Sequence, residues 1–162
     1  MAKEKFPVTT AIRALREGKI LFTEHLYPYE EKGGTAASSR ELGVPEHCVI
    51  KTLVMENDKK EPLIILMHGD CQVSTKELAR QIGARSVVPS SPEAANRHTG
   101  YLVGGTSPFG TRQSLPVYVE ASILELDRIY INGGKRGFLV ALAPQDLVKL
   151  LKPTAVTVAI NG

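Results

Sequence analysis

The chain has 162 residues, of which 43% are hydrophobic, and a formal net charge of +3. That length suits one domain with a real core, and that hydrophobic content excludes a largely disordered chain. No apolar run is long enough to cross a membrane, and residues 1–7 lack the apolar stretch of a signal peptide. The two cysteines, Cys48 and Cys71, give no disulfide framework. We therefore expect a single domain over residues 1–162 that is reduced, cytoplasmic and without a membrane partner.

Helix and strand signals alternate along the first half of the chain, with no linker and no repeat. Thr9 or Thr10 caps a first helix, and Gly18 ends it. Residues 57–60 are rich in turn formers, so the strands on either side form an antiparallel hairpin. In chain order, the patterns predict a helix up to Arg16, a strand over residues 20–27, a polar loop over 29–34, a helix over 35–43, and strands over 49–56 and 63–68.

The second half continues with shorter elements. Ser74 and Glu77 form a capping box for a helix that Gly83 ends, and Ser91 caps a helix with Pro92 at its first position. The remaining patterns predict strands over residues 86–88, 117–119, 128–131 and 138–142, a helix over 144–151, and a last strand over 156–160. Several strand pairs are too close for helical crossovers. We therefore expect an α+β fold with a mixed, mainly antiparallel sheet.

Lys51 stands alone in an apolar strand, Val-Ile-Lys-Thr-Leu-Val over residues 49–54. Because side chains alternate along a strand and both faces of this one are mostly apolar, Lys51 projects from a covered surface. A buried ammonium group without a partner is unfavourable. Lys51 therefore either reaches water at a sheet edge or lines a pocket, where it meets a ligand that carries negative charge or oxygen acceptors.

Residues 100–110, Gly-Tyr-Leu-Val-Gly-Gly-Thr-Ser-Pro-Phe-Gly, form a glycine-rich and almost uncharged segment. Glycine lets a backbone approach a ligand closely. The segment is not a P-loop, because the Gly-Lys-Ser/Thr ending is missing, and Pro108 and Gly110 favour irregular backbone over the helix that a dinucleotide-binding fingerprint requires. It is either a pair of tight turns or a pocket wall whose N–H groups hold a carbonyl oxygen.

A second glycine segment, Asn-Gly-Gly-Lys-Arg-Gly over residues 132–137, carries two cations. It is either a hairpin turn with solvated charges or a contact to substrate phosphates. The mild net charge permits a polyanionic partner without demanding one, and no lysine or arginine block resembles a nucleic-acid-binding tail.

Other catalytic chemistries lack support in the sequence. Cys48 follows His47, but nothing in the sequence specifically brings a thiolate and a base together, so Cys48 is interpreted as a small buried hydrophobic residue at a strand start. The His68-Gly69-Asp70-Cys71 run is interpreted as a strand end with a turn, and ligand spacing typical of a metal site is absent. No pair of carboxylates suggests acid–base catalysis. We therefore expect no metal and no cofactor.

Three segments together resemble the YbaK family of bacterial deacylases. They are the Lys51 strand and residues 99–110 and 129–137, and their order and spacing fit over nearly the whole chain. The family includes Cys-tRNA(Pro) deacylase and is similar to the editing domain of prolyl-tRNA synthetase. The resemblance implies a single α+β domain with a twisted mixed sheet, partly barrel-like and flanked by helices. It also implies trans-editing, the hydrolysis of the ester that joins a wrong amino acid to tRNA(Pro).

The resemblance implies roles for individual residues. Lys51 matches the family's essential lysine and is the expected catalytic residue, and Tyr27 matches a pocket tyrosine. For a cysteinyl substrate, the resemblance implies that the substrate's own thiol attacks its ester carbonyl and releases a thiolactone. The other expected substrate-binding residues are Gly104, Gly105, Thr106, Ser107 and Pro108, which match the family's Gly-x-x-x-Pro loop, and Asn132, Gly133, Gly134, Lys135 and Arg136 of the basic turn.

Two departures from the family pattern leave the amino acid open. Asn132 stands where many members have serine, and residues 31–37 do not match the acidic Gly-Asp-Glu pattern of cysteine-specific members. Cysteine on tRNA(Pro) is the expected substrate, and alanine is the alternative. Two other functions also remain open: a non-catalytic aminoacyl-tRNA-binding or synthetase accessory module, and a hydrolase of amino-acid derivatives that acts without tRNA. Prolyl-tRNA synthetase is a candidate partner that would add tRNA selectivity.

Overall fold

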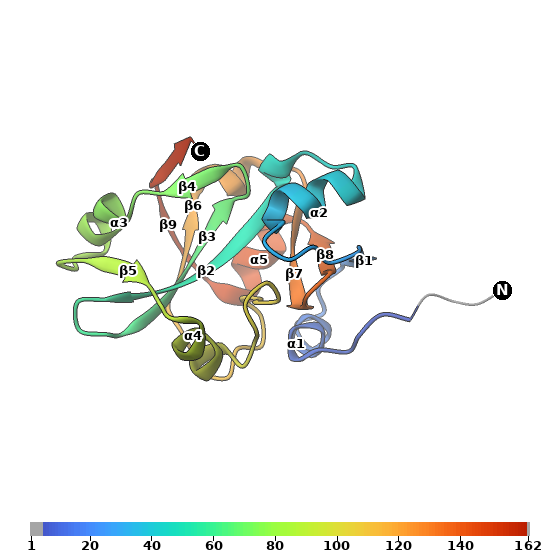
Figure 1. The fold of residues 1–162 in the computed structure, drawn as a ribbon, viewed down its shortest axis with the longest axis horizontal. Coiled ribbons are helices and arrows are strands. Elements are labelled where there is room, and N and C mark those ends of the chain that lie inside the picture. The colour runs from blue at the N-terminus through green and yellow to red at the C-terminus, as the bar shows by residue number, and fades with distance from the viewer. Residues whose placement is uncertain (1–4, 162) are drawn as a thin grey trace.

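The computed structural model describes residues 5–161, so residues 1–4 of the N-terminal segment and residue 162 lie outside the described part. The elements alternate along the chain (Figure 1). The helices are α1 (Thr10–Glu17), α2 (Gly34–Leu42), α3 (Thr75–Ile82), α4 (Pro92–Thr99) and α5 (Pro144–Leu151), with 3-10 helices η1 (Glu46–Cys48) and η2 (Ala121–Glu125). The strands are β1 (Thr23–Leu26), β2 (Val49–Asn57), β3 (Pro62–His68), β4 (Cys71–Val73), β5 (Val87–Pro89), β6 (Val117–Glu120), β7 (Ile129–Lys135), β8 (Phe138–Leu142), β9 (Thr154–Val156) and β10 (Ala159–Asn161).

The main sheet is mixed, as the sequence predicts. Its strand order is β1-β8-β7-β2-β3-β6-β9, and β5 pairs with the far end of β2. The predicted β2–β3 hairpin is present and antiparallel, whereas β2 pairs in parallel with β7, β3 with β6, and β6 with β9. β10 and β4 form a small second sheet. β2 therefore connects the β7–β8 side of the molecule to the β3–β6 side.

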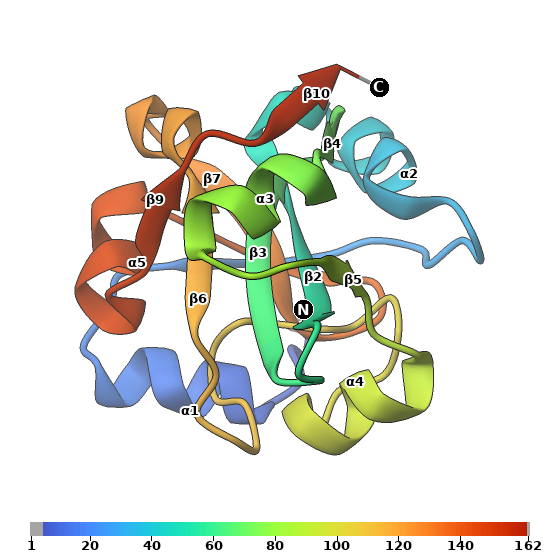
Figure 2. The ribbon, with the colours of Figure 1, turned by 90° about the vertical axis from the view of Figure 1, so that its left-hand side faces the viewer.

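The sheet separates two apolar cores. On one face, side chains of α1, α5 and η2 pack against residues such as Ile64, Ile131 and Val140. On the other face, Leu78 and Ala79 of α3 pack against Ile65 and Met67 of β3. Figure 2 shows α3 lying across this second face. Alternating burial along β3 thus gives each core its own set of side chains from one strand.

Helix caps follow the sequence signals. Thr9, Ser74 and Ser91 each accept a backbone N–H of the first helical turn through their hydroxyl, at 3.1 to 3.2 Å. Such caps satisfy donors that a helix start otherwise leaves unpaired. Half of the predicted capping box is missing, because the Glu77 carboxylate pairs with Arg80 instead of its own helix start.

The structure differs from the sequence prediction where tertiary contacts, rather than local sequence patterns, determine where a strand begins and ends. The first strand begins at Thr23 rather than at residue 20, and Ile20 enters the core with 7% exposure. The short strand β4 carries too little pattern to be predicted. The predicted final strand is two strands, because the buried Glu120 carboxylate accepts the N–H groups of Val158 and Ala159 at 2.7 and 2.9 Å and turns the chain between them. No helix within residues 5–161 has the length and apolar character needed to span a membrane.

Candidate aminoacyl-ester site

The glycine-rich segment, residues 100–110, is folded around one of its own side chains. Tyr101 is 6% exposed, and its hydroxyl donates to the carbonyl oxygen of Phe109 at 2.5 Å. Thr10 Oγ1 lies 2.8 Å from the same hydroxyl. Burial raises the pKa of Tyr101, while the Thr10 contact opposes that rise. The segment is therefore a compact loop with fixed ends rather than a pair of independent turns.

The start of α1 holds both glycine segments. Thr9 Oγ1 donates to the Gly133 carbonyl oxygen at 2.5 Å. Gly110 has φ of +64°, and a Cβ there would lie 2.5 Å from the Thr10 carbonyl oxygen, so only glycine fits. Thr9 and Thr10, which the sequence indicates only as helix caps, thus also fix the spacing of the two segments.

The second glycine segment is mostly strand, not loop. β7 runs through Lys135, with an irregular register between Asn132 and Lys135 before β8 begins at Phe138. Asn132 Oδ1 accepts the N–H of Gly134 at 2.6 Å and that of Lys135 at 3.1 Å. These bonds replace the ladder bonds that the irregularity removes. Asn132 therefore shapes the hairpin end that carries the two cations.

The two glycine segments touch each other. Asn132 Nδ2 donates to the Gly104 carbonyl oxygen at 3.1 Å, and Arg136 Nε donates to the Val103 carbonyl oxygen at 2.8 Å. A Cβ on Gly105 would lie 2.8 Å from the Arg136 nitrogen and 3.0 Å from the Lys135 carbonyl carbon. Glycine at position 105 is thus required for the close approach of two backbones.

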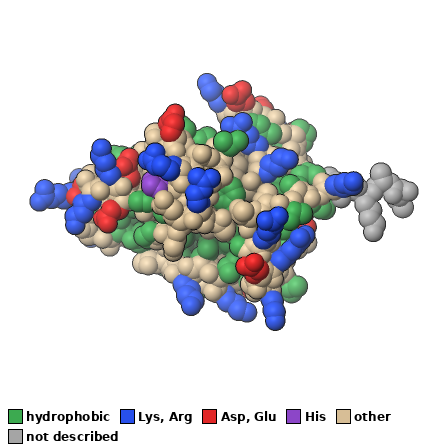
Figure 3. All heavy atoms as spheres, turned by 90° about the horizontal axis from the view of Figure 1, so that it is seen from below, with side chains coloured by type: hydrophobic (Ala, Val, Ile, Leu, Met, Phe, Trp, Pro, Cys, Tyr) green, Lys and Arg blue, Asp and Glu red, His purple; other side chains and the backbone are tan. Residues whose placement is uncertain are grey.

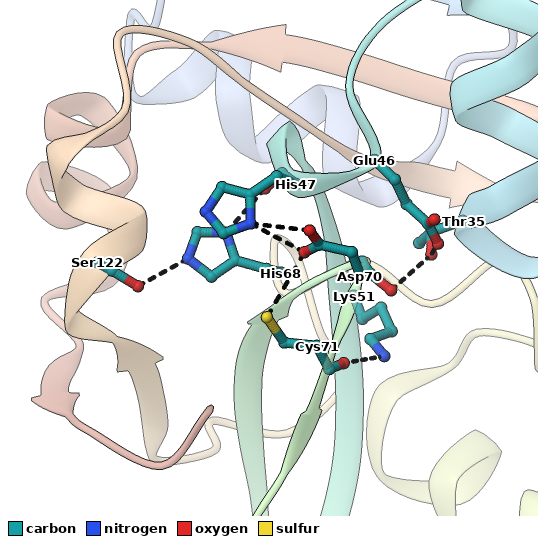
Figure 4. Close-up of polar contacts among 9 residues, drawn as sticks. Thr35, Glu46, His47, Lys51, His68, Asp70, Cys71 and Ser122 are labelled. Atoms are coloured by element: carbon teal, nitrogen blue, oxygen red, sulfur yellow. Dashed lines mark hydrogen bonds and ion pairs between the residues drawn. The ribbon is translucent and has the colours of Figure 1, made fainter. Parts of the chain in front are cut away.

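Lys51 is half-buried and donates from Nζ to the carbonyl oxygen of Cys71 at 2.5 Å (Figure 4). Within residues 5–161, no carboxylate lies within ion-pair distance of this ammonium group. An ammonium group has three N–H donors, and the Cys71 carbonyl accepts one of them. Lys51 therefore retains donor capacity for further oxygen acceptors.

Strand register places Lys51 and Asn132 one residue beyond the last paired residues of β2 and β7. β2 pairs in parallel with β7 at Val49↔Tyr130 and Ile50↔Ile131, and both isoleucines belong to the same core. Because side chains alternate, Lys51 and Asn132, one residue further along each strand, point to the opposite face. Asn132 contacts Gly104 there. The strand lysine, the glycine-rich loop and the basic turn are thus parts of one region.

Two tyrosines border this region. The Tyr27 backbone N–H donates to the Gly137 carbonyl oxygen at 2.9 Å. Burial raises the pKa of Tyr27, as does neighbouring Tyr29, while contacts with Gly137 and with Ser38 of α2 oppose the rise. Tyr29 was not predicted as a site residue, yet its ring lies under the Arg136 guanidinium at 5.3 Å and beside Gly104. Its place in a polar loop gives no sequence signal for this contact.

The other predicted substrate-binding residues differ in exposure. Gly105, Ser107, Pro108 and Gly133 are buried, Thr106 and Gly134 are half-buried, and Gly104, Lys135 and Arg136 are exposed. The Ser107 hydroxyl accepts the Phe109 N–H at 3.2 Å and has no exposed surface, so it supports the loop. The Gly105 N–H is also used, by the Leu102 carbonyl at 2.8 Å.

Two surface hollows lie away from this region. One, of about 540 Å³, lies between α3 and β5, and the other, of about 590 Å³, lies at the β2–β3 turn. Neither is lined by a predicted site residue. The predicted site around Lys51 is therefore separate from both of these hollows.

The cysteines do not have the surroundings of nucleophiles. Burial raises the pKa of the Cys71 thiol, and the charge and hydrogen bond of Asp70 raise it further. A thiolate, the reactive form, is disfavoured there. Cys48 lies at the end of η1, immediately before β2, so its predicted place at a strand start is correct, but it is half-buried rather than buried.

Comparison with known proteins defines the class. The family model described as the aminoacyl-tRNA editing domain matches residues 30–150, and the chain belongs to that family. Within it, the chain is 30% identical over 152 residues to EbsC of Enterococcus faecalis, whose name assigns it Cys-tRNA(Pro)/Cys-tRNA(Cys) deacylase activity. The alignment covers 93% of both chains.

Other relatives agree with this class. A proline–tRNA ligase of Thermodesulfovibrio yellowstonii is 35% identical over 80 residues, which are 49% of this chain and 14% of that enzyme. A solved structure described as a trans-editing enzyme for prolyl-tRNA synthetase superposes with a TM-score of 0.82 at 20% identity, covering 96% of this chain and 100% of that one. This likeness confirms the α+β editing-domain fold that the sequence predicts.

Proposed function

We propose that this protein is a trans-editing deacylase, which hydrolyses the ester between a wrong amino acid and its tRNA. The observation that carries the proposal is the β2–β7 register, which places Lys51 on the same face of the sheet as Asn132, whose amide contacts the Gly104 loop. Membership of the aminoacyl-tRNA editing family supplies the class of substrate. Cysteine on tRNA(Pro) is the proposed substrate, in agreement with the activity named for the E. faecalis relative.

The proposed chemistry uses the substrate's own nucleophile. The cysteinyl sulfur attacks the ester carbonyl carbon, the bond from that carbon to the tRNA ribose oxygen breaks, and the ribose oxygen takes up the thiol proton. The products are a cyclic thiolactone and free tRNA. The protein then supplies orientation and electrostatic stabilisation rather than a covalent group. The disfavoured thiolate of Cys71 and the buried hydroxyl of Ser107 support this assignment.

Lys51 is the proposed catalytic residue. Its Nζ is held by the Cys71 carbonyl, and its remaining N–H donors face acceptor oxygens of the aminoacyl-adenosine end. The glycine loop supplies amides for the carbonyl oxygen. Since the Leu102 carbonyl already uses the Gly105 N–H, we assign this role to the N–H of Thr106, which is half-buried.

The tRNA contacts are electrostatic. Lys135 is exposed on the turn beside the site, and we assign it a contact to a tRNA phosphate. Arg136 contacts the Val103 carbonyl oxygen and the Tyr29 ring. We therefore assign Arg136 mainly to positioning the glycine loop, with a phosphate contact as its second role. Figure 3 shows lysine and arginine side chains spread over the face that carries α1 and α4. Arg13, Arg16 and Arg97 of these helices are exposed and extend the cationic surface.

Deacylation assays with Cys-, Ala- and Ser-tRNA(Pro) at enzyme excess test the function directly. The proposal expects release of cysteine fastest, with a thiolactone trapped before free cysteine accumulates. Release of alanine alone would show that alanine, not cysteine, is the amino acid removed, and would keep the assignment as an aminoacyl-tRNA deacylase. Tight binding of misacylated tRNA with no release of any amino acid would contradict the catalytic role and favour a binding module. Hydrolysis of free aminoacyl esters at the same rate as aminoacyl-tRNA would contradict a tRNA substrate.

A second assay with added prolyl-tRNA synthetase tests whether the synthetase recruits this protein. We expect recruitment to restrict deacylation to fewer tRNAs.

A further inference from the structure

A group of metal-ligating side chains lies outside the proposed aminoacyl site, at the turn between β3 and β4. His47 Nδ1 is 2.9 Å from Asp70 Oδ1, and Cys71 Sγ is 3.5 Å from the same oxygen. One ligand atom from each residue lies within 4.8 Å of the other two. His47 comes from η1, Asp70 from the turn and Cys71 from the first position of β4, and His47 and Asp70 are 23 residues apart in the chain. Figure 4 shows the three side chains converging.

The spacing suits a tetrahedral zinc ion. Ligand atoms about 2.0 to 2.3 Å from such an ion lie about 3.3 to 3.5 Å from one another. The two separations that involve Asp70, 2.9 and 3.5 Å, are within a few tenths of an ångström of this geometry, and the ligand atoms of His47 and Cys71 lie within 4.8 Å of each other. Imidazole, thiolate and carboxylate are all zinc ligands, and the Cys71 thiol, whose thiolate is disfavoured without an ion, would lose its proton to solvent on binding zinc. A thiolate ligand disfavours magnesium and calcium. Side chains of His47 and Asp70 are 46% and 43% exposed, which gives an ion access from solvent and leaves a position for water.

A buried histidine fixes the His47 ligand. The His68 ring stacks on the His47 ring at 3.7 Å with 6° between the planes. His68 Nδ1 donates to the His47 carbonyl oxygen at 2.7 Å, and its Nε2 then accepts from Ser122 Oγ, also at 2.7 Å. His68 thus uses both nitrogens on protein partners and serves as a support, in the way that outer residues orient ligands in metal sites.

The same turn holds Lys51. The Cys71 carbonyl accepts from Lys51 Nζ, while the Cys71 side chain belongs to the three-residue group (Figure 4). An ion bound by Asp70 and Cys71 would restrain the backbone that positions the lysine. Binding of an ion would therefore affect the position of the Lys51 amine through Cys71.

We propose that His47, Asp70 and Cys71 bind a zinc ion that fixes the β3–β4 turn. This goes beyond the deacylase function, and the binding stands or falls independently of it. It also revises the sequence expectation of no metal, because no ligand spacing along the chain links His47 to Asp70 and Cys71.

Cobalt titration of the full chain, after treatment with a chelator and a reductant, tests the site. The expected result is binding of one ion per chain, with a sulfur-to-cobalt charge-transfer band and visible ligand-field bands that zinc abolishes. Cys71→Ser should lose the charge-transfer band. Cys48→Ser is the matched control, because it removes the other thiol and should leave the band unchanged. Zinc should raise the Tm of the wild type and of Cys48→Ser, but not of Cys71→Ser.

Two surface variants keep the test decisive if Cys71→Ser fails to fold. His47→Gln and Asp70→Asn change half-exposed side chains, and each should weaken zinc binding by about tenfold or more. No cobalt band in the wild type would overturn the proposal. So would a band that survives in Cys71→Ser, a band lost in Cys48→Ser, or zinc affinity unchanged in both surface variants.

Discussion

The Asn132 side-chain amide bridges the two glycine segments. Its Nδ2 donates to the Gly104 carbonyl oxygen at 3.1 Å, while its Oδ1 accepts the Gly134 N–H at 2.6 Å. Both halves of the amide are thus used, one on each segment. Position 132 therefore determines how far the glycine loop lies from the hairpin end.

Replacing Asn132 tests this bridge. Asn132→Ser shortens the side chain, so it keeps at most the contact to the hairpin and frees the Gly104 carbonyl. We expect the free energy of unfolding to fall by about 1 kcal/mol. We expect the single-turnover rate of deacylation to fall by a larger factor than this free energy corresponds to. Urea unfolding and single-turnover kinetics measure the two effects. Unchanged single-turnover kinetics in Asn132→Ser would show that the bridge does not shape the site.

Gly105→Ala should separate the two loops. The new Cβ would lie 2.8 Å from the Arg136 nitrogen, which is backbone and has no rotamer to change. We expect the folded protein to lose deacylation by about 100-fold, because the carbonyl-binding wall shifts. Gly83→Ala is the matched control. Its φ of +77° makes alanine strained, by about 1 to 2 kcal/mol, but nothing lies within 4 Å of the new Cβ. Equal activity of both variants would contradict the close-approach argument.

Arg136 should not be replaceable by lysine. Its Nε donates to the Val103 carbonyl oxygen, and its guanidinium lies over the Tyr29 ring. A lysine keeps the charge but loses the planar group that makes both contacts. We expect Arg136→Lys to weaken substrate binding about as much as Arg136→Ala does, in titrations of single-turnover rate against enzyme concentration. Lys135→Arg, at the exposed neighbouring position, should leave the rate nearly unchanged. Wild-type substrate binding in Arg136→Lys would show that position 136 needs only a positive charge, as a phosphate contact does.

His25 should make stability depend on pH. Burial lowers its pKa below 6.5, and the positive charge of Arg128 lowers it further. The unfolded chain therefore binds the proton first as the pH falls, so the His25 contribution to stability is complete above pH 6.5 and is lost as the pH falls through the lowered pKa. We expect His25→Gln to flatten this part of the unfolding profile, and Arg128→Gln to raise the His25 pKa measured by NMR. A His25 pKa that does not change in Arg128→Gln would contradict this assignment.

The sequence predicted the helices and long strands because caps and periodicity are local. It could not predict contacts that register and chain reversal create. Lys51 and Asn132 lie on the same face of neighbouring strands because of the parallel β2–β7 pairing, which neither strand's own pattern encodes. Tyr29 reaches Arg136, and His47 reaches Asp70, across long stretches of chain. The family resemblance located Lys51 and the glycine loop, and the structure adds Tyr29 and the support from Thr9.

The most direct test of the account is single-turnover hydrolysis of Cys-tRNA(Pro) by the wild type and by Lys51→Ala. Lys59→Ala, an exposed change on the β2–β3 turn, controls for the loss of one positive charge. We predict rapid release of tRNA by the wild type and by Lys59→Ala, and a rate lower by about 100-fold or more in a folded Lys51→Ala protein. Wild-type rates in Lys51→Ala would contradict the central claim that the strand lysine acts on the aminoacyl end.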